Sequence, residues 1–261
     1  MSLSLACTGV QAAPPTPTAP PTPTARSAAN PQESPPVSPA QTASSLTDQT
    51  LSIRQQAIVP IAAFAAAGDL GKLNAALNHG LDAGMTLSDA KEVLVQLYAY
   101  AGFPRSLNAL GELMKVQQAR KQRGINDAPG TEPSRPIPKG DALLAAGTAN
   151  QTKLSGGEVA GPLFDFAPVA NEYLRAHLFG DIFERDNLDW QSRELATVAM
   201  LSALPGTEPQ LQAHMRISMN VGNTEGQLRH LGQILDERAD PAYAQRARAA
   251  LDRHLATKAA G

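Results

Sequence analysis

The spacing of the apolar residues constrains the fold of this 261-residue chain more than any other feature. From residue 51 onward they recur every three or four positions, and no segment alternates between apolar and polar residues as a half-buried strand would. Thr86–Asp89 and Thr224–Gln227 have the form of helix capping boxes, and Gly84 and Gly222 end the apolar stripes before them. The sequence therefore predicts an all-α fold, a helical bundle without a β-sheet.

The same signals place the individual helices. Gly102-Phe103-Pro104 interrupts the pattern in the first half, Asp189 is a natural N-cap, and Pro241 follows Asp240 at a first helical position. Helices are expected over residues 52–67, 70–83, 86–101, 105–123, 169–179, 190–203, 208–221 and 224–235, with a last one from 241 onward.

The first 50 residues differ from the rest in composition. Ten of the 21 prolines lie between Pro14 and Pro39, among Thr, Ala and Ser, with no aromatic residue and no apolar period. Such a segment buries too little apolar surface to offset its ordering entropy. Residues 1–50 are therefore expected to form a disordered leader.

The first residues of this leader allow two interpretations of the cellular compartment in which the protein works. Val10-Gln11-Ala12 resembles a signal-peptide cleavage site and Leu5-Ala6-Cys7 a degraded lipoprotein box, but a positive n-region and a full apolar segment are missing. One interpretation is an exported protein, periplasmic or secreted, whose signal is truncated at its start. It is preferred because Pro/Thr-rich tethers commonly follow export signals. The alternative is a cytoplasmic protein with an unstructured N-terminus.

An internal repeat organises the rest of the chain. A shift of 138 residues superposes Leu73 on Leu211, Gly84 on Gly222 and Thr86 on Thr224. Residues 51–123 and 163–261 are therefore predicted to be two related helical repeats that pack together. Residues 124–162 between them contain seven glycines and five prolines and are expected to be a linker.

Composition excludes several classes of protein. A net charge of −2, with 22 basic and 24 acidic residues, offers no basic field for nucleic acid. The single cysteine, Cys7, excludes an internal disulfide, a CxxC redox pair and a thiolate metal site. No apolar run approaches the length of a transmembrane helix, and the histidines show no HExxH-type spacing. No metal and no cofactor are expected.

Two stretches carry a more specific signal. The first contains Gln96, Tyr100-x-Gly102-Phe103-Pro104 and Asn108-Ala109-Leu110; the second contains Phe179-Gly180-Asp181-Ile182, Arg193-Glu194-Leu195, His214 and Asn220-Val221-Gly222-Asn223-Thr224. Both resemble the carboxymuconolactone decarboxylase family, which is related to the alkylhydroperoxidase D family. The chain looks like a tandem member with an added Pro-rich leader. The resemblance implies an alkylhydroperoxidase D-like helical bundle, a homo-oligomer and a small-molecule substrate.

The resemblance also implies the chemistry. In the peroxidase relatives a Glu and a His relay protons to a CxxC pair, but Thr207 and Gln210 stand seven and four residues before His214 here, so that chemistry is excluded. Decarboxylation of a carboxylated lactone needs no metal in principle. The protein must stabilise the oxyanion that develops on the lactone carbonyl and deliver a proton to carbon. A carboxy-lyase reaction on a small carboxylated lactone or related acid is therefore the leading hypothesis.

Six residues are candidates for this chemistry. His214, Glu194 and Arg193 are predicted as catalytic residues, and Tyr100, Gln96 and Phe103 as substrate-binding residues. The first half has Ala76 where the second has His214 and, with a one-residue slip in the shift, Gln55 where the second has Glu194. The second half lacks the Tyr-x-Gly-Phe-Pro segment. Each half thus keeps what the other has lost, which predicts one composite site per chain.

Less specific interpretations of the same residues stay open. His214 and Tyr100 also suit a core edge, Arg193 and Glu194 a structural ion pair, and Gln96 a helix surface. At the level of function, the alternatives are a cofactor-free lactone hydrolase or isomerase, and a non-catalytic helical oligomer that binds a small molecule.

Overall fold

The computed structural model describes residues 49–259. Within them the only regular elements are helices, so the predicted all-α fold is confirmed. The predicted leader, with Cys7 and the Pro-rich segment, lies outside the described residues except for Gln49 and Thr50. Every helix in the described part is too short or too polar to cross a lipid bilayer.

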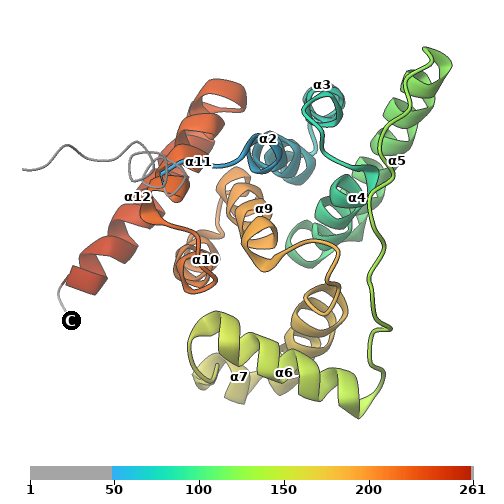
Figure 1. Cartoon of the computed structure of the whole chain (residues 1–261). Helices are drawn as coiled ribbons and strands as arrows, with labels where there is room; N and C mark the ends of the chain where they lie inside the picture. Colours follow the sequence, from blue (N-terminus) through green and yellow to red (C-terminus); the bar gives the residue numbers. More distant parts are fainter. Residues whose placement is uncertain (1–48, 260–261) are drawn as a thin grey trace, which may run out of the picture. The chain divides into compact units, whose positions relative to one another are not determined.

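The elements follow one another along the chain as shown in Figure 1. They are α2 (Ile53–Ala67), α3 (Leu70–Asp82), α4 (Leu87–Gln96), α5 (Tyr98–Gln122), α6 (Asp141–Ser155), α7 (Pro162–Phe166), α8 (Pro168–Tyr173), the π-helix η1 (Leu174–Ile182), α9 (Trp190–Ala203), α10 (Glu208–Asn220), α11 (Glu225–Arg238) and α12 (Pro241–Ala259).

The predicted helix ends are confirmed in detail. Thr86 and Thr224 both form complete capping boxes, in which the threonine side chain accepts from the N3 backbone and the N3 side chain accepts from the threonine N–H. The Asp189 carboxylate accepts from the backbone N–H of Ser192 at the start of α9. Gly102 interrupts α5 with φ 80° and ψ 160°, a backbone conformation that favours glycine.

Helices α2 and α9 lie side by side at the centre of the bundle (Figure 1). In α2 the nine residues from Ile58 to Ala66 are all buried, and in α9 the twelve from Ser192 to Ala203. A helix that is buried on all sides needs no amphipathic stripe. Small alanine side chains in both helices allow the neighbouring helices to approach closely. The core of the fold is therefore built around this pair.

The helices before and after the linker pack in corresponding ways. Helix α2 packs on α3 as α9 packs on α10, and α5 contacts α3 and α4 as α12 contacts α10 and α11. In addition, α11 packs on α2, and α4 packs on α9. Two related repeats would produce this arrangement, although their common origin stays a prediction.

The segment 124–162, expected to be a linker, contains helix α6. No helix was expected within this segment, yet these fifteen residues form one, and Gly147 serves close packing there and not a turn. A Cβ on Gly147 would lie 1.9 Å from the carbonyl oxygen of Arg175 in η1. The absence of a side chain at Gly147 lets α6 pack directly against η1, and together they form a layer beside the bundle (Figure 1).

Candidate active site

A buried carboxylate–imidazole pair joins two core helices. Glu194 of α9 is fully buried and His214 of α10 is 7% exposed. Nδ1 of His214 lies 2.8 Å from Oε2 of Glu194. An ionised carboxylate can only accept hydrogen bonds, so this contact places the proton of the neutral imidazole on Nδ1 and leaves Nε2 for another partner.

Tyr100, from the start of α5, contacts this pair. Its ring meets the His214 ring edge-on, with centroids 5.4 Å apart and an interplanar angle of 79°. Burial, and after it the charge of Glu194, raises the pKa of Tyr100 well above its ordinary value, although Thr197 and Arg193 oppose this shift. The phenol therefore stays protonated at neutral pH and can donate a hydrogen bond.

Two polar atoms at this place lack a partner among the described residues. They are the hydroxyl of Tyr100, which makes no hydrogen bond of normal geometry, and Oε1 of Glu194. Buried polar atoms are almost always hydrogen-bonded, so each unsatisfied one needs an explanation. A buried donor and a buried acceptor without partners, next to an imidazole, suit the binding of a polar group of a ligand.

Arg193 does not join the Glu194–His214 pair. Its fully buried guanidinium donates from Nη2 to Oε2 of Glu92 on α4, at 2.9 Å, and to the carbonyl oxygen of Arg185, also at 2.9 Å. Burial alone would raise the pKa of Glu92, but hydrogen bonds from Arg185, Arg193 and Asn187 outweigh it and lower that pKa. Arg193 thus forms the structural ion pair that was its alternative role, with Glu92 as its partner.

Gln96, like Glu92, connects α4 to α9. Its Nε2 donates to the carbonyl oxygen of Arg193, at 3.0 Å, and to Oγ1 of Thr197, at 2.7 Å. Gln96 is fully buried, so it is not the surface amide considered above. Its contacts fix α4 against α9 beneath Tyr100.

Phe103 points elsewhere. It is 61% exposed and stacks on Tyr98, with ring centroids 4.5 Å apart and planes within 5°. The structure therefore brings together Tyr100, Glu194 and His214 directly. It places Gln96 and Arg193 behind them and Phe103 on the surface.

Sequence reasoning missed Glu92, Arg185 and Thr197. One signal for Glu92 was available, since Glu92, Gln96 and Tyr100 are spaced by four residues and so share a helix face. A charged residue on an otherwise buried face needs a partner. No comparable pattern pointed to Arg185, which lies between helices and bonds Glu92 through two nitrogens.

The layer of α6 and η1 borders the site. Leu178 and Phe179 of η1 form an apolar cluster with Ile217 of α10, and Tyr100 packs against this cluster. Short π-helical segments occur frequently at functional sites, because the extra residue per turn redirects side chains. Tyr100 thus lies where the bundle meets this layer.

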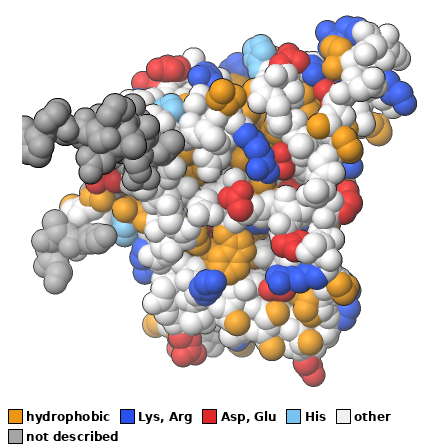
Figure 2. Space-filling model, viewed as in Figure 1, with side chains coloured by type: hydrophobic (Ala, Val, Ile, Leu, Met, Phe, Trp, Pro, Cys, Tyr) orange, Lys and Arg blue, Asp and Glu red, His pale blue; other side chains and the backbone are white. Residues whose placement is uncertain are grey.

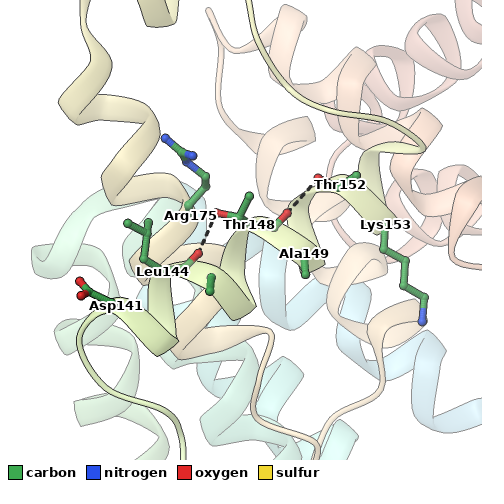
Figure 3. Close-up of a pocket in the computed structure, with 8 residues that line it drawn as sticks. Asp141, Leu144, Thr148, Ala149, Thr152, Lys153 and Arg175 are labelled. Carbon is green, nitrogen blue, oxygen red and sulfur yellow. Dashed lines mark hydrogen bonds between the residues drawn. The ribbon is translucent and has the colours of Figure 1, made fainter.

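Other surfaces fit the proposed chemistry less well. A shallow groove of about 750 Å³ runs over α6 (Figure 3), but its Thr148 and Thr152 hydroxyls bond carbonyl oxygens of their own helix. On the face shown in Figure 2, acidic and basic side chains are mixed and neither sign dominates. Among residues 49–259, no group of three or more His, Cys, Asp or Glu residues is placed to hold a metal ion.

A similarity to a known family covers part of the second half of the chain. Residues 168–253 match the model of the carboxymuconolactone decarboxylase family. No curated protein matches the chain. The matched segment contains Arg193, Glu194 and His214. It begins after the first half, which contributes Tyr100 and Gln96. Residues 168–253 of the chain are therefore similar to the carboxymuconolactone decarboxylase family.

Proposed function

We propose that this protein is a cofactor-free carboxy-lyase that acts on a small carboxylated lactone or a related organic acid. The observation that carries the proposal is the buried Glu194–His214 pair beside the unpaired hydroxyl of Tyr100. This pair favours an enzyme over a binding module, because an imidazole that is oriented by a carboxylate is suited to proton transfer.

Each residue has a definite role in the proposed reaction. The bond between the substrate carbon and its carboxylate breaks, carbon dioxide leaves, and the electron pair passes through the conjugated system to the lactone carbonyl oxygen. Tyr100 donates a hydrogen bond to that oxyanion. His214 in its imidazolium form delivers the proton from Nε2 to carbon, and Glu194 orients the ring and stabilises the imidazolium.

Arg193 and Gln96 act in this scheme as positioning residues. Both hold α4 against α9, so they set the place of Tyr100 relative to Glu194 without touching the substrate. This assignment replaces the direct catalytic and substrate-binding roles suggested by their places in the motif.

Assembly and location are part of the proposal. Exposed apolar side chains gather on α5, with Phe103 and Leu107, and on α7, with Leu163 and Phe166. Such side chains support a homo-oligomer that covers them. The Pro-rich leader supports export, which would favour an organic acid met outside the cytoplasm over the family's namesake substrate.

The test is turnover of γ-carboxymuconolactone by the purified full-length protein, followed as carbon dioxide release and as ring opening. His214→Gln is expected to lower carbon dioxide release at least about 100-fold, the usual effect of losing a general acid or base. His79→Gln, an exposed histidine on α3, is the matched control. Ring opening without carbon dioxide would replace the lyase by a hydrolase. Turnover that His214→Gln leaves unchanged would reject the site.

A further inference from the structure

A cavity lies away from the Glu194–His214–Tyr100 cluster. It has a volume of about 670 Å³ and is formed by α2, α3 and the C-terminal end of α11. Its lining includes no residue of the Glu194–His214–Tyr100 cluster. Most of its walls are apolar, with Ile53, Ala57, Pro60 and Phe64 from α2, Ala76 from α3 and Ala83 just after α3.

The residues of this cavity correspond, through the predicted repeat, to residues of the candidate active site. The 138-residue shift pairs Ala76 with His214 and Tyr100 with Arg238, and both Ala76 and Arg238 line the cavity. Helix α11 packs on α2 as α4 packs on α9. A methyl group thus stands where the imidazole would be, and a guanidinium where the phenol would be.

The groups needed for proton transfer are missing at this place. With the one-residue slip upstream of α3, the counterpart of Glu194 is Gln55, whose amide oxygen is engaged with the backbone N–H of Ser52 in a capping box. The replacement of histidine by Ala76 leaves space where the other half has a side chain. The cavity can therefore bind a ligand, but it lacks the carboxylate–imidazole pair that could transform one.

One cation at the cavity has no acidic partner among the described residues. Arg238 donates to the neutral Oε1 of Gln56, at 3.3 Å, and no ion pair joins it to a described carboxylate. Lys72 is neutralised by its ion pair with Asp69, at 3.3 Å, and lies over the Phe64 ring. Glu237 also lines the cavity, so the binding of an anion would depend on Arg238 and not on an excess of positive charge.

We propose that this cavity is a second, non-catalytic binding site for a monocarboxylate with an apolar body, anchored by the guanidinium of Arg238. The apolar walls of α2 and α3 take up the body of the ligand, and the carboxylate bonds Arg238 at the end of α11. The planar guanidinium suits a carboxylate because two parallel hydrogen bonds can form.

The experiment is calorimetric titration of the full-length protein with octanoate, and with octylamine and octan-1-ol as probes of equal chain length. Octanoate is expected to bind once per chain with a dissociation constant below about 1 mM, and the other two more weakly. Arg238→Gln is expected to weaken octanoate binding about 10-fold or more, because a charge-assisted hydrogen bond is lost. Arg229→Gln, on the same helix but outside the cavity, removes the same charge and should change nothing.

A second variant tests the location. Ala75 is exposed at the rim of the cavity, so Ala75→Phe fills space without disturbing the core, and it should abolish binding while leaving the melting temperature unchanged. His214→Gln should leave octanoate binding intact, which separates this proposal from the proposed lyase activity. Three results would overturn the proposal. They are the absence of saturable binding, octylamine binding as tight as octanoate binding, and an octanoate dissociation constant that Arg238→Gln does not change.

Discussion

The rings of Tyr100 and His214 meet edge-on with centroids 5.4 Å apart, although the two residues come from different halves of the chain. Tyr100 follows α4, which is fixed to α9 through Gln96 and Glu92, whereas His214 is tied to α9 through Glu194. Helix α9 is therefore the common support of both residues. A site of this kind depends on the packing of α4 against α9 as much as on the residues at its centre.

Tyr100→Phe separates activity from stability. The hydroxyl makes no hydrogen bond of normal geometry among the described residues, so its removal should leave the free energy of unfolding unchanged or raise it by up to about 1 kcal/mol. Carbon dioxide release should fall about 100-fold to 1000-fold, the usual cost of losing an oxyanion donor. Turnover and urea denaturation of the same preparation check both. A destabilised but fully active variant would show that the hydroxyl is structural.

Glu194→Gln tests the orienting carboxylate. An amide nitrogen facing Nδ1 of His214 would favour the other tautomer, so the rate should fall about 100-fold or more. Nitrogen-15 spectra of the imidazole should show Nδ1 protonated in the neutral wild-type ring and a changed tautomer in the variant. Glu225→Gln on the surface of α11 is the control. An unchanged tautomer together with an unchanged rate would remove Glu194 from the mechanism.

Glu92→Gln should destabilise the fold by about 3–5 kcal/mol at pH 7, because it leaves the buried guanidinium of Arg193 without its anion. The exposed pair of Glu225 and Arg229 offers a contrast, and Glu225→Gln should cost less than about 1 kcal/mol. Thermal and urea unfolding of both variants give the comparison. Equal small losses would mean that the Glu92 network adds little to stability.

The lowered pKa of Glu92 predicts how the stability of the fold depends on pH. The folded protein lowers the pKa of Glu92, so its contribution to stability is fully present above the unfolded-state pKa of about 4.3 and is lost as the pH falls through the lower folded-state value. The difference in unfolding free energy between wild type and Glu92→Gln should therefore shrink only below about pH 4. A difference that shrinks between pH 8 and pH 5 instead would point to another group.

Gly147→Ala tests the layer that borders the site. Its Cβ would meet the backbone oxygen of Arg175, which cannot rotate away, so the substitution should cost about 1–3 kcal/mol or more. Gly111, inside α5, has no atom within 4 Å of an added Cβ, and Gly111→Ala should stabilise by about 0.5–1 kcal/mol. Melting temperatures that shift in opposite directions would bear out the close packing of α6 on η1. A neutral Gly147→Ala would contradict it.

Much of the fold followed from local signals in the sequence. The capping boxes at Thr86 and Thr224 and the N-cap at Asp189 mark helix starts because each satisfies backbone N–H groups that the helix leaves unpaired. Helix α6 escaped prediction because Gly147 and its polar neighbours resemble a loop locally. Only the approach of η1 shows why a glycine stands there.

Spacing and residue type along the chain were enough to predict the all-α class, most helix boundaries, the resemblance to the carboxymuconolactone decarboxylase family and the absence of a CxxC pair. Which candidate residues meet depended on how the helices pack. This packing paired Glu194 with His214, placed Tyr100 against them, turned Phe103 to the surface and gave Arg193 to Glu92. The physical reason is that a buried charge takes the partner that packing brings within reach, and packing joins helices far apart in sequence.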